Sequence, residues 1–149
     1  MLKELYLEPL PEDKSLCIFF NNELIYSSKG KWLHPLFDFQ KYLEDNPLPN
    51  SHSPGKSAES AILAAHDTAV GKAAAFLMVR AGITKIHANL ASALAVNYVE
   101  QLNKKGAKIS FTYDNLIPRL QCKTETELAE VFDDEEISAL LQKRLESAM

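Results

Sequence analysis

The chain of 149 residues contains only two cysteines and no long apolar run. Cys17 and Cys122 lie far apart, and Cys17 falls within an apparent strand, so we expect a buried free thiol there rather than a disulfide. No apolar stretch approaches the ~20 residues that cross a bilayer. The starting segment MLKELYLEPLPEDKS carries acidic residues and prolines where a signal peptide has an uninterrupted apolar core. These absences predict a cytoplasmic protein without a membrane partner.

Charge of one sign is also scarce, because 16 Lys and Arg residues stand against 20 Asp and Glu residues, for a net charge of −4. Lys104, Lys105 and Lys108 cluster near a predicted helix end, where cations interact favourably with the helix dipole. A surface for double-stranded nucleic acid requires a broader basic stripe. The content of 46% hydrophobic and 24% charged residues is typical of an ordinary globular domain. We therefore expect a single domain over residues 1–149 and no nucleic-acid duplex as partner.

Two β-rich runs near the start of the chain flank a pair of asparagines. LCIFF at 16–20 and ELIYS at 23–27 surround Asn21-Asn22, and asparagine tolerates the positive φ of a tight turn, so this pattern predicts a β-hairpin. The following segment KWLHPLFDFQKYLED has the apolar spacing of an amphipathic helix, with Pro35 in its first turn. Residues 46–60, NPLPNSHSPGKSAES, have the composition of a mobile surface loop.

The stretch AILAAHDTAVGKAAAFLMVRAG, residues 61–82, combines an apolar run, a polar break and a helical pattern. We interpret residues 62–65 as a buried strand, His66-Asp67-Thr68 as a tight polar turn, and the residues from Gly71-Lys72 onward as a helix. In α/β proteins, ligands bind at the carboxyl ends of strands, where helix N-termini present free amide groups. This stretch therefore predicts where a site lies, but not its chemistry.

Strand and helix patterns alternate in the residues that follow. Residues 83–90 (ITKIHANL) and 108–113 (KISFTY) are predicted strands. Between them lies a predicted helix, which Ser92 caps and Gly106 terminates. Each strand is thus followed or preceded by a helix long enough to form a crossover between parallel strands.

The C-terminal part, 124–149, has the pattern of two helices. Thr124 and Glu127 form a capping box for a short helix through Phe132, and Asp133 caps a last amphipathic helix. With the hairpin and the strand–helix units, these helices predict an α/β fold. We expect a three-layer α/β/α sandwich whose mixed sheet has about five strands.

The segments LCIFFNNELIYSSKG and HDTAVGKAAAFLMVRAGITKIHANL, with the helix and strand after them, resemble an uncharacterised bacterial family, a "domain of unknown function". The resemblance covers residues 15–113 and is sharpest at Asp67 and over 70–75 (VGKAAA). Members are grouped with the cytidine deaminase-like fold, so the resemblance implies that fold and a bacterial, cytoplasmic protein without an established reaction. The segment at 46–60 departs from the family pattern, and IPRLQCKTE around Cys122 is shorter than in related members.

The ligands of a zinc-dependent deaminase are missing from the sequence. Such an enzyme needs a His or Cys ligand beside a general-base Glu on one helix and a P-C-x-x-C turn on the next. The first predicted helix offers Trp32-Leu33-His34-Pro35 without an H-x-E motif, and the second starts at 67–71 without a cysteine. We therefore expect no zinc site, and no other metal or cofactor motif is visible.

The candidate ligand-binding residues lie at the polar turn and the helix start, and they are His66, Asp67, Thr68, Gly71 and Lys72. Glycine lets an anion approach the backbone amides and lysine adds a positive charge, so a small anion or a nucleotide is the expected ligand. The complete Walker pattern G-x-x-x-x-G-K-[ST] is absent. The alternatives are that Gly71 serves packing while Lys72 faces water, that Asp67 caps the helix, and that His66 is a hydrogen-bonded bystander.

Three functions stay open at this point. The first is a non-catalytic domain that binds a small anionic ligand. The second is a homo-oligomeric interaction module, because the aromatic residues around the first helix exceed one buried stripe. These residues are Trp32, Phe37, Phe39 and Tyr42. The third is a metal-free enzyme in which His66 and Asp67 act as acid and base and Cys122 as nucleophile, although the sequence assigns no catalytic residue.

Overall fold

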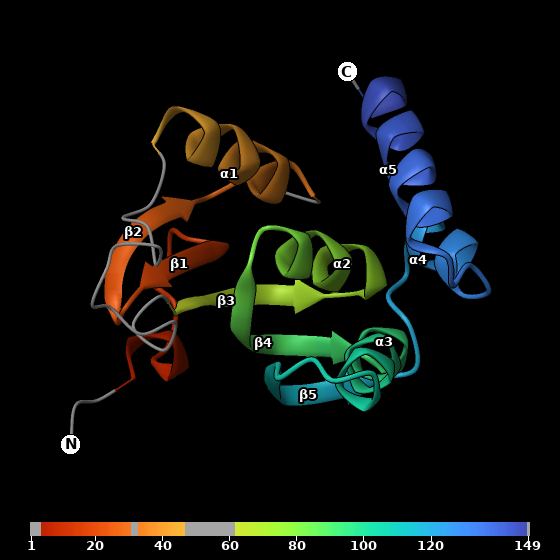
Figure 1. Ribbon diagram of the computed structural model, residues 1–149. Coiled ribbons are helices and arrows are strands. Elements are labelled where there is room, and N and C mark those ends of the chain that lie inside the picture. Colours follow the sequence, from red (N-terminus) through yellow and green to blue (C-terminus); the bar gives the residue numbers. More distant parts are fainter. Residues whose placement is uncertain (1–3, 31–32, 47–61, 149) are drawn as a thin grey trace.

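The computed structural model describes residues 4–30, 33–46 and 62–148, and it contains a mixed five-stranded sheet (Figure 1). The strand order is β2-β1-β3-β4-β5. Strand β1 is antiparallel to both β2 and β3, whereas β3, β4 and β5 run parallel to one another. The strands are β1 (Leu16–Phe20), β2 (Glu23–Ser28), β3 (Leu63–Val70), β4 (Ile83–Ser92) and β5 (Ser110–Ile117). The predicted α/β fold with a mixed sheet of five strands is thus confirmed.

Five α-helices and one short 3₁₀ helix accompany the sheet in the described residues. They are η1 (Leu5–Leu7), α1 (His34–Asp45), α2 (Lys72–Arg80), α3 (Ala93–Lys104), α4 (Lys123–Leu128) and α5 (Asp134–Ala148). Figure 1 shows α1 and α2 on the same side of the sheet, and α4 and α5 together near the C-terminal end of the chain. Within the part of the chain that the structure describes, no helix is both long and apolar enough to cross a membrane.

One predicted turn and two predicted helix caps are present in the structure. Asn21 and Asn22 have φ values of 50° and 65°, and they join β1 to β2 in the expected hairpin. The Ser92 hydroxyl accepts a hydrogen bond from the Ala95 amide at 3.1 Å and caps α3. Asp133 caps α5, because its carboxylate accepts from the backbone amide three residues later. These features depend only on neighbouring residues, which explains why the sequence reveals them.

Two predicted boundaries are wrong. His66-Asp67-Thr68 form no turn, because β3 continues through Val70 and pairs with β1 on one side and β4 on the other. A central strand with partners on both edges satisfies its backbone groups even where its side chains are polar. The predicted capping box is also wrong, because Thr124 lies inside α4, which starts after Cys122 without a side-chain cap and ends at Leu128.

The five α-helices of the described residues pack on one face of the sheet. Buried apolar residues of α1 to α5 form one cluster with Leu16 and Ile18 of β1 and with their neighbours on β3 and β4. On the opposite face, Cys17 and Phe19 form a small second cluster with Tyr6 of η1. Right-handed crossovers that advance in one direction, from β2 to β3 to β4 to β5, place their helices on the same side. The described residues therefore lack the second helical layer of the predicted sandwich.

Two further predictions concern the cysteines and the long loop. Both cysteines are free, and Cys17 is buried, as expected. Burial raises the pKa of the Cys17 thiol above its ordinary value. The predicted mobile loop over 46–60 falls, apart from Asn46, outside the described residues.

Candidate functional site

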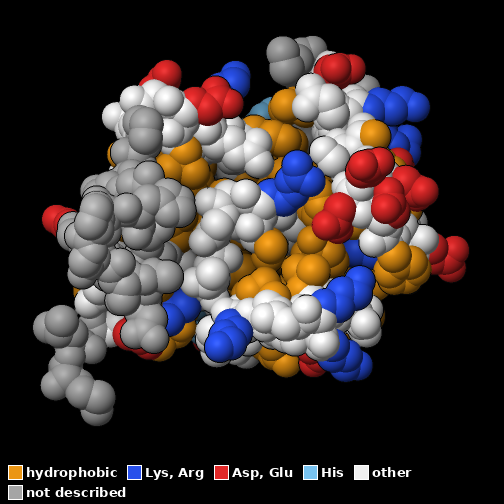
Figure 2. Space-filling model, viewed as in Figure 1, with side chains coloured by type: hydrophobic (Ala, Val, Ile, Leu, Met, Phe, Trp, Pro, Cys, Tyr) orange, Lys and Arg blue, Asp and Glu red, His pale blue; other side chains and the backbone are white. Residues whose placement is uncertain are grey.

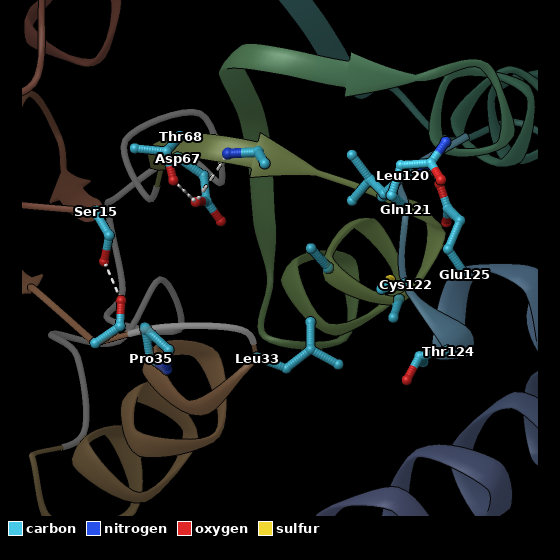
Figure 3. Close-up of a pocket in the computed structure, with 15 residues that line it drawn as sticks. Ser15, Leu33, Pro35, Asp67, Thr68, Leu120, Gln121, Cys122, Thr124 and Glu125 are labelled. Atoms are coloured by element: carbon cyan, nitrogen blue, oxygen red, sulfur yellow. Dashed lines mark hydrogen bonds between the residues drawn. The ribbon is translucent and has the colours of Figure 1, made fainter. Parts of the chain in front are cut away.

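A pocket of about 360 Å³ lies at the carboxyl end of β3, beside the N-terminus of α2 (Figure 3). The sequence predicts a site at this strand–helix junction. Five separate segments contribute to its wall: the start of β1, the region where α1 begins, the end of β3, the first turn of α2, and the connection from β5 into α4. The lining residues are Ser15, Gly30, Leu33, Pro35, Asp67, Thr68, Ala69, Gly71, Ala73, Ala74, Leu120, Gln121, Cys122, Thr124 and Glu125.

Asp67 is the predicted site residue whose carboxyl group faces this pocket (Figure 3). One carboxyl oxygen accepts long hydrogen bonds, both of 3.4 Å, from the Thr68 hydroxyl and the Ala69 amide. The side chain keeps some contact with solvent but is enclosed by the pocket walls. Burial raises the pKa of Asp67 to about 7, and the hydrogen bonds from Ala69 and Thr68 only partly oppose that rise. The carboxyl group therefore exchanges its proton near neutral pH.

The prediction that Asp67 caps α2 is wrong. The N-cap of α2 is Gly71, four residues further along, because β3 is longer than its apolar run suggests. A carboxylate does occupy this helix start, but it comes from α4. Glu125 accepts from the Lys72 amide at 2.8 Å through one oxygen and from the Leu120 amide at 3.1 Å through the other. A negative charge at a helix N-terminus is favoured by the helix dipole.

Gly71 lets α4 come close to the start of α2. A Cβ atom at this position would lie 2.7 Å from the Leu120 side chain and 2.8 Å from the Glu125 carboxylate. Real Cβ contacts are longer, so a larger residue would displace these groups. The packing role that the sequence suggests for Gly71 is therefore supported, although its close neighbours belong to the β5–α4 connection and α4.

Lys72 does not face the pocket, and it does not face water either. Its side chain is buried, and its ammonium group donates to the Leu128 carbonyl at 3.0 Å and the Val131 carbonyl at 2.6 Å. The ammonium group also lies 4.4 Å from the centre of the Phe132 ring. Burial lowers the pKa of Lys72, and the negative charge of Glu125 opposes that change. The alternative in which Lys72 faces water is thus wrong, because its side chain forms hydrogen bonds to the end of α4 and to the connection between α4 and α5.

His66 lies on the other face of the sheet from Asp67, because neighbouring strand residues point to opposite faces. Its ring nitrogens lie 2.9 Å from the Tyr6 carbonyl and 2.9 Å from the side-chain oxygen of Asn89. The ring also meets His87 edge-on, with 4.8 Å between ring centres, and His87 is in turn bound to two side chains of β5. The hydrogen-bonded alternative for His66 is therefore correct, and an acid–base pair with Asp67 is excluded by this geometry.

Sequence reasoning missed the contribution of α4 to the pocket. Cys122 and Thr124 both line it, and Thr124 is buried at 5% exposure. Figure 3 shows the Thr124 hydroxyl at the cavity wall. The capping-box pattern that includes Thr124 gave no sign of this role, because α4 reaches the pocket only through packing on α2.

Charged side chains of both signs lie on the face shown in Figure 2, and no continuous basic stripe crosses the described residues of that face. Nor do three or more His, Cys, Asp or Glu side chains converge as metal ligands in the described part of the chain. The pocket therefore has to be interpreted from its own few polar groups.

Residues 7–145 match the model of a family described as "TM1506: Domain of unknown function (DUF1893)". A similar solved structure is the crystal structure of the DUF1893 family protein TM1506 from Thermotoga maritima. It is 26% identical, has a TM-score of 0.65, and the match covers 89% of this chain and 82% of that chain. No curated protein matches the chain in sequence. The resemblance to a family of unknown function is thus confirmed, whereas the cytidine deaminase-like grouping stays a prediction.

Proposed function

We propose that this chain, which belongs to the DUF1893 family of unknown function, is a binding domain for a small organic molecule. The observation that carries this proposal is the pocket at the end of β3, with the Asp67 carboxyl and the Thr124 hydroxyl on walls that are otherwise mostly apolar. Its volume of about 360 Å³ lies within the range of small-molecule sites, roughly 300–1,000 Å³.

The position and acidity of Asp67 support this proposal. Asp67 lies in the central strand β3, which is held by β1 and β4, so its side chain is attached to a rigid element. A carboxyl group with a pKa of about 7 costs the folded protein stability when it ionises. Groups of this kind cluster at functional sites, where their altered acidity is used.

The pocket favours an uncharged or cationic ligand over the expected anion or nucleotide. Among the described residues, no lysine, arginine or histidine lines it. Lys72, the predicted cation, binds the carbonyls of Leu128 and Val131 instead. The first amide of α2 already donates to Glu125. A phosphate group would therefore meet two carboxyl groups in the pocket and no positive side chain of the described chain.

A metal-free enzyme is the second candidate, because Asp67 and Cys122 line the same pocket. A base and a thiol in one cavity are the minimum for nucleophilic chemistry. His66, the third residue of that hypothesis, is on the opposite face of the sheet. We therefore rank this function below simple binding.

The sequence-based argument for a homo-oligomer was a surplus of aromatic residues around the first helix, and it does not hold for the described ones. Phe39 is fully buried, and its ring packs against Tyr26 and Tyr42 with centres 5.3 and 6.0 Å apart. Phe37 is partly buried against the same core. These aromatic residues are therefore used within the fold, and Trp32 lies outside the described residues.

A fragment titration followed by NMR tests the binding function. The probes are amines, alcohols, carboxylates, phosphate monoesters and nucleosides, and the readout is the shift of backbone amide resonances. Ala74→Leu fills the pocket from α2, and Ala139→Leu is its control on the exposed face of α5. We expect at least one probe class to shift pocket resonances in the wild type and the control, and not in Ala74→Leu. Shifts that persist in Ala74→Leu, or no shifts with any probe, would contradict the proposal.

A further inference from the structure

The ionisable groups of the pocket are all acidic or neutral in the described chain: Asp67, Cys122 and Glu125. Both oxygens of Glu125 accept backbone amides, at 2.8 and 3.1 Å, so this carboxylate is already used. Asp67 is different, because its two hydrogen bonds go to one oxygen. Its second oxygen has no partner among the described residues and points into the cavity in Figure 3.

Two hydroxyl groups of the pocket wall, those of Ser15 and Thr124, also offer acceptors. The Ser15 hydroxyl donates its proton to the Gly30 carbonyl at 2.7 Å, which leaves its oxygen lone pairs for a ligand. Thr124 is only 5% exposed, and its hydroxyl oxygen, at the cavity wall in Figure 3, can also accept a hydrogen bond from a ligand. An ammonium group has three donors and no acceptor, which matches these oxygen atoms.

The N-terminus of α2 does not oppose a cation here. Its dipole is positive at this end, but the Glu125 carboxylate is bound directly to the first amide and compensates that charge. The lysine at this helix start, Lys72, has its ammonium group turned toward the carbonyls of Leu128, at the end of α4, and Val131, just after it. The local charge in the described part of the pocket is therefore negative once Asp67 ionises.

The remaining wall suits a compact apolar body. Leu33 and Pro35 from the α1 side, Ala73 and Ala74 from α2, and Leu120 from the β5–α4 connection all contribute apolar surface. From this arrangement we infer that the pocket takes a small organic cation, an ammonium group on a compact hydrocarbon, with Asp67 as its anionic partner. This inference rests on the proposed binding function and names the chemical class of its ligand.

The inference implies that proton and ligand compete for Asp67. Burial raises the pKa of this carboxyl to about 7, so the cation loses its partner as the solution becomes more acidic. For a ligand that stays protonated throughout, the apparent Kd rises about 30-fold between about pH 8.5 and about pH 5.5. Cys122 and Glu125, the other titratable groups that face the pocket, belong to α4 and its N-cap.

Three probes of matched shape test the ligand class: cyclohexylmethylamine, cyclohexylmethanol and cyclohexanecarboxylate. Each is titrated by NMR into the wild type, Asp67→Asn and the exposed control Asp45→Asn, at both pH values. We expect the amine to bind more tightly than the alcohol and the carboxylate, with the 30-fold pH dependence worked out above. Asp67→Asn should bind the amine at least about tenfold more weakly and without pH dependence, while Asp45→Asn behaves as the wild type.

The outcomes separate this inference from the binding function. If the alcohol or the carboxylate binds as tightly as the amine, and Ala74→Leu abolishes that binding, the ligand class is wrong and the binding function stands. A pH dependence that survives in Asp67→Asn would assign it to Cys122 or Glu125 and overturn the role of Asp67. If no probe shifts pocket resonances, this ligand class is wrong, and the wider fragment set decides the binding function.

Discussion

Replacing Asp67 by asparagine should stabilise the protein at neutral and alkaline pH, although it removes a charge from the proposed site. The ordinary pKa of this carboxyl is 3.8, and burial raises it to about 7 in the folded protein. The folded state therefore binds the proton more tightly than the unfolded state does. Between these two values the free energy of unfolding falls by about 1.4 kcal/mol for each pH unit. Asparagine is neutral at every pH and is free of this penalty.

The size of the effect follows from the same two values. A difference of about three pKa units corresponds to about 4 kcal/mol, as an upper limit. The pocket admits some solvent to the Asp67 side chain, which screens the charge and reduces the effect to about 2–4 kcal/mol. For a domain of this size, that difference in unfolding free energy shifts the melting temperature by roughly 5–15 °C. The gain should be complete above about pH 8 and should vanish near pH 4.

Urea unfolding followed by far-UV circular dichroism measures this prediction. The wild type, Asp67→Asn and the exposed control Asp45→Asn are unfolded at several pH values from about 4.5 to about 8.5. The difference between the wild type and Asp67→Asn should grow steadily as the pH rises, whereas Asp45→Asn should run parallel to the wild type. Parallel curves for Asp67→Asn and the wild type would show that Asp67 titrates near its ordinary value, and the reasoning on its burial would be refuted.

Three further substitutions test the packing around the pocket, each by urea unfolding. Lys72→Met removes the ammonium group that donates hydrogen bonds to the carbonyls of Leu128 and Val131, and should cost about 1–3 kcal/mol with faster amide exchange in α4 and α5; unchanged exchange there would contradict this. Gly71→Ala places a Cβ within 2.8 Å of Leu120 and Glu125, and should cost about 1–3 kcal/mol. Equal stability of Gly71→Ala and the wild type would mean that α4 shifts readily to make room for the added methyl group. Ser92→Ala removes the hydroxyl that caps α3 and should lower the free energy of unfolding by about 0.5–2 kcal/mol. A change outside this range would contradict the role of the cap.

The hairpin and the capped helices could be predicted because their signals are local. Asn21-Asn22 adopt positive φ wherever two β-rich runs flank them, and Ser92 caps whichever helix follows it. The extent of β3 could not be predicted in this way. Its polar residues look like a turn in isolation, and they form strand only because β1 and β4 supply backbone partners on both edges.

The sequence predicts a site at the junction of β3 and α2, but it does not predict which side chains meet there. The junction of β3 and α2 is recognisable from an apolar run followed by a helical pattern, and Asp67, Thr68 and Gly71 do line a pocket there. The roles of His66 and Lys72 were not recognisable. Each side chain forms hydrogen bonds to residues remote in sequence: the Tyr6 carbonyl for His66, and the carbonyls of Leu128 and Val131 for Lys72.

By itself, the sequence determined the order of strands and helices, the mixed five-stranded sheet and the strand–helix junction beside which the pocket lies, because periodicity and turn residues act over a few positions. Only the tertiary structure decided which charges face that pocket. Packing α4 on α2 placed the carboxylate of Glu125, 53 residues from Lys72 in the chain, at the helix start. The same packing turned the Lys72 ammonium group toward carbonyls that are 56 and 59 residues away in the chain. Such contacts depend on how whole elements pack, and no local pattern encodes them. Asp67 thereby became the carboxyl group with an oxygen left free for a ligand in the described pocket.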